Sequence, residues 1–203
     1  MKFSDMEYKR PDIDKVVAEF DTLLRSFENA GSFEEEKAVI ESVTKLRKSF
    51  ESMKVLAFIN YSNDTTNQKF QEEQDYFDDV SPIYDECLTK YDKALASCRF
   101  KSEVQSHFGD YLCKLAEMNA RTINHEVIDD LQKENHLGSQ YMKLKASAKI
   151  NFRGNELNLQ EMEPFMESED RQTRMDAFHA YWNFFSDNAK EFDDIYDELV
   201  YLR

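Results

Sequence analysis

Apolar side chains recur at alternating steps of three and four residues along nearly the whole chain, and residues that break helices are rare. This spacing gathers the apolar residues on one face of an α-helix, which turns once every ~3.6 residues. The 203 residues include 4 glycines and 3 prolines, where average usage gives roughly 14 and 10. We therefore expect an all-α protein, an antiparallel helical bundle of long helices.

Three apolar stripes cover the first hundred residues. Gly31 ends the first helix, and a capping box at Ser32–Glu35 begins the second. The pattern Thr65–Gln68 predicts the start of the third helix in the same way. Pro82 lies within the third stripe, so either this helix kinks or Ser81 caps a new helix there. The stripes consist of Ile13, Val16, Val17, Phe20, Leu23, Leu24 and Phe27; of Ile40, Val43, Leu46, Phe50, Met53 and Ala57; and of Phe70, Phe77, Val80, Tyr84, Cys87, Tyr91 and Leu95.

Two further helices are expected at about 102–121 and 125–148. The one departure from helical spacing is 149–159, where apolar and polar residues alternate on both sides of Gly154–Asn155. Alternation around such a turn predicts a short β-hairpin, which must pack on other elements to be stable. A short helix with Met162, Phe165 and Met166 follows the hairpin.

A long final helix is expected from an N-cap at Ser168 to the end of the chain. No Gly or Asn cap and no proline stop follows its stripe. We therefore expect the chain to be cut within a helix, so that residues 1–203 are part of a larger protein. This part can divide into two lobes, 1–100 and 101–203. The stripe consists of Met175, Phe178, Trp182, Phe185, Ala189, Phe192, Tyr196, Leu199 and Leu202.

The chain carries 41 acidic and 26 basic residues, a formal net charge of −15. Such a surface repels phosphate groups, so we expect neither nucleic acid nor an anionic membrane as a partner. The acidic residues are spread along the helices, which is typical of a solvated surface; the functional alternative is attraction of cationic peptides.

The cysteines Cys87, Cys98 and Cys113 are odd in number, show no CxxC spacing and lie in apolar helical stretches. Reduced, packed cysteines in a cytoplasmic protein fit this pattern best. The N-terminal residues lack the apolar stretch of a signal peptide, and no window has the ~18 apolar residues of a membrane span.

Two motifs resemble parts of metal sites. The stretch His125–Asp129 has Asp where a zinc-binding HExxH helix has its second His, and Asp176 with His179 has the spacing found in di-iron bundles. Neither is accompanied by the further ligands that such sites need. From the residues alone, the chain is an acidic helical scaffold without a complete active site.

Four stretches, in order along the chain, carry a family resemblance. They are Phe3-x-Asp5-x-x-Tyr8-x-Arg10-Pro11-Asp12; Asp64-Thr65-Thr66 with Phe70-x-x-Glu73-Gln74-Asp75-x-Phe77; Ala146-Ser147-Ala148-Lys149-Ile150-x-Phe152-x-Gly154-x-Glu156-Leu157-Asn158-Leu159; and Ser168-x-Asp170-Arg171-x-x-Arg174-x-x-Ala177-Phe178-x-Ala180-Tyr181-Trp182. Together they resemble the N-terminal region of the oligoendopeptidase F family, relatives of thimet oligopeptidase.

The resemblance implies a cytosolic zinc metallopeptidase that hydrolyses oligopeptides, whose helical N-terminal region forms one wall of a deep channel. The family's catalytic region, C-terminal to this one, supplies an HExxH helix and a later glutamate. Two histidines and that glutamate hold zinc, and the motif glutamate activates water. This chain has no HExxH, so we expect no catalytic and no metal residues in it, no bound zinc, and no activity without the missing C-terminal region.

Two further expectations concern surfaces. The hairpin residues Phe152, Arg153, Gly154 and Asn155 are candidates for contact with an extended peptide substrate; the alternative is a hairpin packed on its own helices. The exposed face of 175–202 is a candidate for self-association. The competing function is a stand-alone, non-catalytic helical module that binds peptides or a protein.

Overall fold

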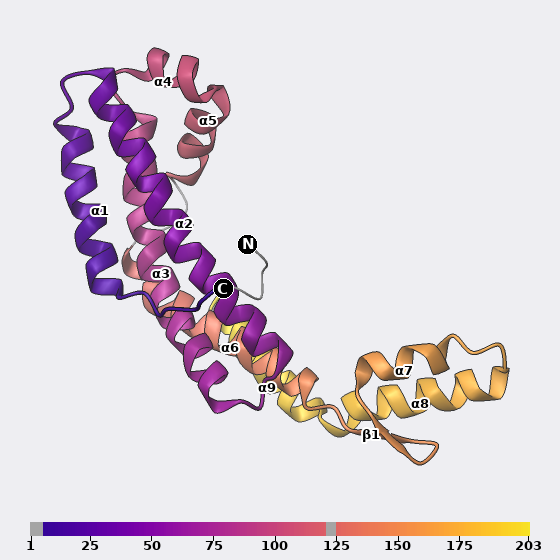
Figure 1. Cartoon of the computed structure of the whole chain (residues 1–203). Helices are drawn as coiled ribbons and strands as arrows, with labels where there is room; N and C mark the ends of the chain where they lie inside the picture. Colours follow the sequence, from indigo (N-terminus) through magenta and orange to yellow (C-terminus); the bar gives the residue numbers. More distant parts are fainter. Residues whose placement is uncertain (1–5, 121–124) are drawn as a thin grey trace. The chain divides into compact units, whose positions relative to one another are not determined.

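The computed structural model describes residues 6–120 and 125–203, and Figure 1 shows its helices and its one small sheet. Nearly all the regular structure is α-helical, so the expected all-α class with a short β-hairpin is confirmed. By their contacts, the residues form two compact units, Met1–Gln132 and Lys133–Arg203. Among the described residues, no helix is long and apolar enough to cross a membrane.

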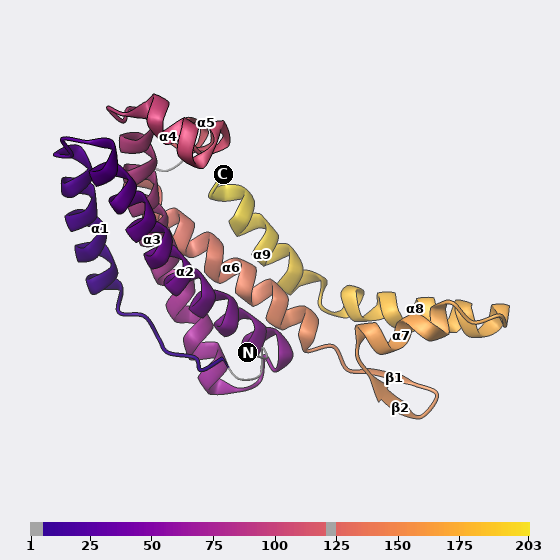
Figure 2. The ribbon, with the colours of Figure 1, turned by 45° about the horizontal axis from the view of Figure 1, so that its top comes forward.

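The first unit is built on three long helices, α1 (Ile13–Glu28), α2 (Phe33–Asn63) and α3 (Gln68–Ala96). Figure 2 shows that α2 runs antiparallel to α1 and α3, which confirms the expected antiparallel bundle. Each helix turns its apolar stripe toward the other two, because only that arrangement removes all three stripes from water.

Stacked aromatic rings form the centre of this bundle. Phe50 of α2 is 1% exposed; it stacks on Tyr84 with ring centroids 4.1 Å apart and meets the edge of Phe77 at 5.6 Å. Phe20 of α1 meets Tyr84 edge-on at 5.8 Å. Such pairs each contribute about 0.5–1.5 kcal/mol beyond the burial of their area, so the ring of Tyr84 on α3, in contact with Phe50 of α2 and Phe20 of α1, ties the three helices together.

The helix caps agree with the sequence only in part. Ser32 caps α2 as expected, by accepting a hydrogen bond from the backbone of Glu35, whose carboxylate accepts from the backbone N–H of Gly31 at 2.7 Å. The expected cap at Thr65 is wrong, because Asn67 caps α3 with its side-chain oxygen. An Asn side chain binds nearby backbone N–H groups readily, so it competes well for a cap position.

Pro82 lies inside α3, which continues through it, so the alternative of a new helix at this position is excluded. The single helix expected at 102–121 is wrong. Gly109, with φ of +88°, divides it into α4 (Lys101–Phe108) and α5 (Asp110–Asn119). Only glycine adopts this backbone conformation without strain. Contacts of α4 with α2, and of α5 with α3, place both helices in the first unit.

The fifth helix begins later than expected. A short 3₁₀ turn, η2 (His125–Val127), precedes α6 (Ile128–Ala146), and the unit boundary lies within α6.

The expected hairpin is present as β1 (Ile150–Phe152) and β2 (Asn155–Leu157), but its turn lies one residue earlier than predicted. Phe152 pairs with Asn155, so Arg153 and Gly154 form the two-residue loop, with φ of 51° and 85°. Positive φ at both positions defines a type I′ turn, whose twist matches that of the strands it joins.

The expected single final helix is two helices, α8 (Arg171–Asp187) and α9 (Ala189–Tyr201), which follow the short α7 (Leu159–Met166). Asn188 interrupts the helix, because its side-chain amide donates to the carbonyl oxygen of Phe184 at 2.7 Å and takes over the capping of α8. The expected N-cap at Ser168 is also wrong. Asp170 caps α8 by accepting a hydrogen bond from the backbone N–H of Thr173 at 2.8 Å, and Ser168 in turn accepts from the backbone N–H of Asp170.

Candidate functional site

Helices α6 and α9 lie side by side and antiparallel in the second unit, joined by a small apolar cluster. Its buried members are Leu137 and Leu144 of α6 and Ile195 of α9. A groove follows the seam between the two helices, in two parts of about 580 and 500 Å³. Leu137, Gln140 and Glu198 line both parts, so the two parts adjoin along the seam.

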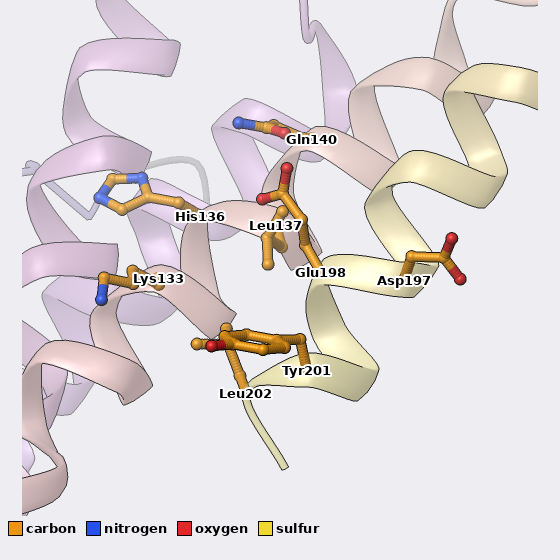
Figure 3. A pocket seen from close by; sticks show the side chains of 8 residues that line it. All are labelled: Lys133, His136, Leu137, Gln140, Asp197, Glu198, Tyr201 and Leu202. Carbon is orange, nitrogen blue, oxygen red and sulfur yellow. The ribbon is translucent and has the colours of Figure 1, made fainter.

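The floor of this groove is apolar and its rim is polar. Figure 3 shows Glu198 and Tyr201 projecting from α9 beside Leu137, with Asp197 on the outer side of the same helix. Tyr201 is 91% exposed, so its ring is accessible. A concave apolar surface with a few polar groups is the usual form of a ligand-binding site.

The rim on the α9 side is strongly acidic. Asp194 forms an ion pair with Lys190 at 2.5 Å. Glu191, Asp197 and Glu198 form no ion pair with another described residue. On the α6 wall, Lys133 and Lys143 already interact with other residues. The uncompensated charge along the groove is therefore negative. The acidic residues of α9 are Glu191, Asp193, Asp194, Asp197 and Glu198.

The hairpin residues proposed from the sequence are only partly accessible. Phe152 is 6% exposed and packs in the apolar cluster of α7 and α8, while Gly154 and Asn155 lie exposed at the turn. The guanidinium of Arg153 donates to the hydroxyl of Thr173 on α8 at 2.5 Å. One face of the hairpin is thus fastened to its own unit, and contact with a substrate stays a prediction for the turn.

An apolar face of α8 is uncovered in the part of the chain that the structure describes. Met175, Phe178 and Trp182 follow one another at helical spacing and are 48%, 47% and 58% exposed. The opposite face of α8 buries Thr173 and Ala177. Three large apolar side chains on one stripe are typical of a surface that another protein segment covers.

The motifs that resemble metal sites gain no support from the geometry. Asp176 and His179 are exposed, and no third His, Cys, Asp or Glu among the described residues lies close enough to complete a ligand set with them. In the stretch His125–Asp129, the 3₁₀ turn replaces the continuous α-helix that an i, i+4 pair needs. The side chain of His125 lies outside the described residues.

The cysteines are unsuited to nucleophilic catalysis. Burial raises the pKa of the Cys87 and Cys98 thiols to about 11 and also raises the pKa of Cys113. All three are free thiols. At neutral pH they are almost wholly protonated, whereas the thiolate is the reactive form.

Comparison with known proteins gives the family. The family model of the peptidase M3 N-terminal domain matches residues 3–123. The chain belongs to the M3 peptidase family. It is similar to a solved protein described as an oligoendopeptidase F from Bacillus anthracis str. Ames, at 44% identity and a TM-score of 0.96, covering 100% of this chain and 37% of that one.

Two further solved structures agree. A second protein described as an oligoendopeptidase F is 40% identical, with a TM-score of 0.96, and the match covers 100% of this chain and 36% of that chain. Pz peptidase A, solved with an inhibitor, is 40% identical with a TM-score of 0.95, over 99% of this chain and 36% of that one. No curated protein matches. The chain is an N-terminal oligoendopeptidase F region that spans little more than a third of these relatives.

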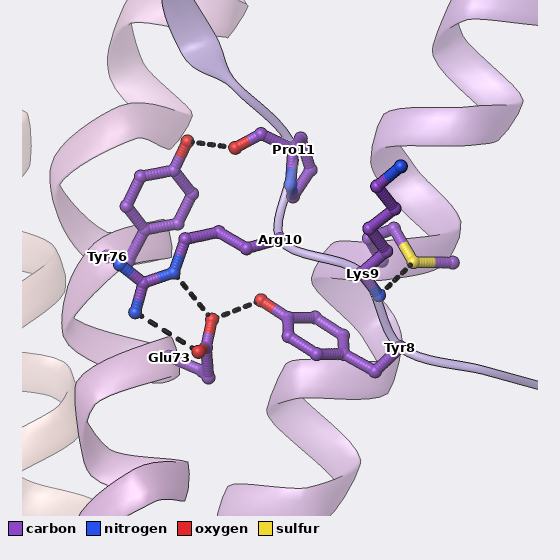
Figure 4. A network of polar contacts seen from close by, with 7 residues as sticks. Tyr8, Lys9, Arg10, Pro11, Glu73 and Tyr76 are labelled. Atoms are coloured by element: carbon purple, nitrogen blue, oxygen red, sulfur yellow. Dashed lines mark hydrogen bonds and ion pairs between the residues drawn. The ribbon is translucent and has the colours of Figure 1, made fainter.

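The tertiary structure explains why the first two stretches of the resemblance occur together in this oligoendopeptidase F region. Figure 4 shows that the Glu73 carboxylate of α3 accepts from the Tyr8 hydroxyl and from Nε and Nη2 of Arg10, the latter two at 2.9 and 3.1 Å. The Arg10 guanidinium lies 4.7 Å from the centre of the Tyr76 ring, and the Tyr76 hydroxyl donates to the carbonyl oxygen of Pro11 at 2.6 Å. The segment before α1 is thus anchored on α3. Phe3 and Asp5, from the same stretch, lie outside the described residues.

The charges of this anchor are matched. Burial alone raises the pKa of the Glu73 carboxyl, but hydrogen bonds from Arg10 and Tyr8 outweigh it and hold that pKa below its ordinary value. Burial, together with the hydrogen bond to Glu73, raises the pKa of Tyr8. Glu73 is therefore ionised and Tyr8 neutral at physiological pH.

The fourth stretch of the resemblance is also structural. Arg174 of α8 donates to the carbonyl oxygens of Ser168 and Glu169 at 2.5 and 2.8 Å, which fastens the loop just before α8 to the helix that Asp170 caps. Tyr8, Arg10, Glu73 and Arg174, which belong to the stretches of the resemblance, therefore stabilise the fold. The groove was not predicted from the sequence; the signal for it was the dense acidic run on α9 beside an apolar stripe.

Proposed function

We propose that this chain is the channel-wall part of a zinc metalloendopeptidase that hydrolyses oligopeptides. The observation that carries the proposal is structural similarity to three solved peptidases. The match covers 99–100% of this chain and 36–37% of each peptidase chain. A region of this kind contributes shape and contacts to the enzyme, while the catalytic residues come from the rest of it.

The uncovered face of α8 supports a docking role within the enzyme. Phe178 and Trp182 are about half exposed in the chain by itself. Burying such side chains against the catalytic region is favourable by roughly 25 cal/mol per Å² of apolar surface. Self-association through the same face is the competing use of this surface.

Zinc belongs to the parent enzyme in this proposal. Catalytic zinc sites use three protein ligands, with histidine the commonest. The sequence of this chain has 4 histidines and no HExxH, so its residues do not fit that site, and we assign them no step of zinc chemistry. Their role is to admit a peptide, position it and limit access of water.

The test is reconstitution. The 203-residue chain and the catalytic region encoded downstream are produced separately, and hydrolysis of a quenched fluorescent peptide is measured before and after mixing. We expect no hydrolysis and no stoichiometric zinc with this chain alone, and hydrolysis with the mixture. The variant Phe178→Glu/Trp182→Glu should abolish reconstitution, whereas Tyr111→Glu, at an exposed aromatic residue of the first unit, should not.

One zinc per chain together with hydrolysis by this chain alone would overturn the proposal. If no catalytic region is encoded downstream and the chain alone binds a partner, the stand-alone module is the correct function.

The hairpin has its own test, which is deletion of 150–157 from the complete enzyme. Unchanged peptide turnover would exclude a substrate contact there.

A further inference from the structure

The α6–α9 groove has the dimensions of a site for a short extended peptide. It runs along α6 from Lys133 to Ser147, which at 1.5 Å per helical residue is about 21 Å. An extended peptide rises about 3.3 Å per residue, so the groove accommodates about six residues. Its two parts, of about 580 and 500 Å³, fall within the usual range for ligand pockets.

The groove combines an apolar floor with an acidic rim. Leu137, Leu144 and Ile195 give an apolar floor, and the accessible ring of Tyr201 stands at one end. Glu191 and Glu198 line the rim without an ion-pair partner among the described residues. An apolar side chain fits the floor, and a lysine or arginine beside it reaches a carboxylate or lies over the tyrosine ring.

We infer that this groove binds oligopeptides in which basic side chains alternate with apolar ones. The inference deepens the proposed function by naming a substrate class, and it rests on that function. Charge complementarity selects the occupant, because the bases on the α6 wall already interact with other groups while the carboxylates on α9 remain uncompensated. A neutral or acidic peptide would leave these carboxylates facing a groove without counter-charge.

The experiment measures binding of fluorescein-labelled hexapeptides to the 203-residue chain by fluorescence polarisation. The three probes alternate leucine with lysine, with glutamine or with glutamate, so they differ mainly in charge. We expect the lysine peptide to bind about tenfold more tightly than the glutamine peptide, and the glutamate peptide to bind most weakly. The preference should shrink as salt rises from about 0.05 to 0.3 M, since exposed charges are screened.

Matched variants locate the site. Glu191→Gln/Glu198→Gln removes two groove charges and should weaken the lysine peptide about tenfold, with little effect on the glutamine peptide. The control Asp193→Asn/Glu163→Gln removes two exposed charges that do not line the groove. It should change affinity less than twofold, although the net charge of the two variants is the same.

Equal binding of the three peptides would overturn the inference, as would an equal loss of affinity in both double variants. A dimer found by analytical ultracentrifugation and disrupted by the groove variant would also overturn it, because a second copy of the chain would then occupy the groove.

Failure of the proposed function gives a different result from failure of the groove assignment. If the complete enzyme hydrolyses peptides but Glu191→Gln/Glu198→Gln leaves its KM for the lysine peptide unchanged, the groove assignment falls and the peptidase assignment stands. If the lysine peptide binds the groove but the complete protein hydrolyses no peptide, the peptidase assignment falls and the groove assignment stands.

Discussion

The anchor of the N-terminal segment on α3 gives the sharpest test of how this fold is held. The perturbation is Glu73→Gln, which keeps the size of the side chain and removes its charge. The wild-type carboxylate accepts hydrogen bonds from Tyr8 and, twice, from Arg10, and a neutral amide cannot hold the guanidinium in the same way.

The magnitude follows from exposure. The Glu73 side chain is 14% exposed and that of Arg10 is 45% exposed. A hydrogen bond to a buried charge contributes about 1.5–3 kcal/mol, whereas a fully exposed ion pair contributes about 0–1 kcal/mol. For this intermediate case we expect a loss of about 2 kcal/mol in the free energy of unfolding. In a chain of this size that lowers Tm by about 4–8 °C.

The pH dependence has a definite sign. The pKa of Glu73 is lowered in the folded protein, so its contribution is present above the unfolded pKa of about 4.3. It is lost as the pH falls through the lower, folded pKa. The difference between wild type and Glu73→Gln should therefore stay constant from about pH 5 to 8 and shrink below about pH 4.

The assay is urea unfolding followed by circular dichroism, in a double-mutant cycle with Arg10→Gln. We expect a coupling energy of at least about 1 kcal/mol between Glu73 and Arg10. The control is Glu72→Gln, the exposed neighbour on α3, with an effect within about 0.5 kcal/mol. An effect of Glu73→Gln no larger than this control, with no coupling to Arg10, would refute the reasoning.

Three further outcomes test the packing, the backbone and the thiols. Phe50→Ala should lower the free energy of unfolding by about 3–5 kcal/mol because it empties the centre of the first unit; the same change at the 44% exposed Phe58 of α2 should cost under about 1 kcal/mol, and urea unfolding measures both. Gly109→Ala should destabilise by about 1–3 kcal/mol because of its positive φ, whereas Gly138→Ala, inside α6 with open space around it, should stabilise by about 0.5–1 kcal/mol. The three thiols, with the pKa of Cys87 and Cys98 raised to about 11 and that of Cys113 also raised, should react slowly with Ellman's reagent at pH 7 in the folded protein and rapidly in urea. Fast labelling of all three thiols in the folded protein would contradict the burial that raises these pKa values.

Local features of the sequence determined most of the helices. The periodic apolar residues placed α1, α2 and α3 within a few residues of their observed bounds. Apolar residues that are buried on one side of a helix must recur with the period of the helix, so their spacing indicates where a helix runs. Composition excluded an extensive sheet, and the alternation at 149–159 located the hairpin. Collinear stretches gave the family, and several of their residues form anchors and caps of this fold.

The interruptions were decided by interactions that periodicity does not report. Asn188 divides the last stripe although the apolar spacing continues across it, because a side-chain amide binds the helix carbonyl there. The loop register of the hairpin depends on which two residues adopt positive φ, and Arg153 takes this conformation while its guanidinium is held by Thr173.

Only the tertiary structure brought together residues that are distant in the chain. Tyr8 and Glu73 are 65 positions apart, and no local pattern states that they meet. The groove arises in the same way. Leu137 and Ile195 belong to helices separated by the hairpin, α7 and α8, so their shared floor exists only after the chain has folded back on itself. The acidic residues of α9 are visible in the sequence, but only the fold places them along an apolar groove that a basic peptide can occupy.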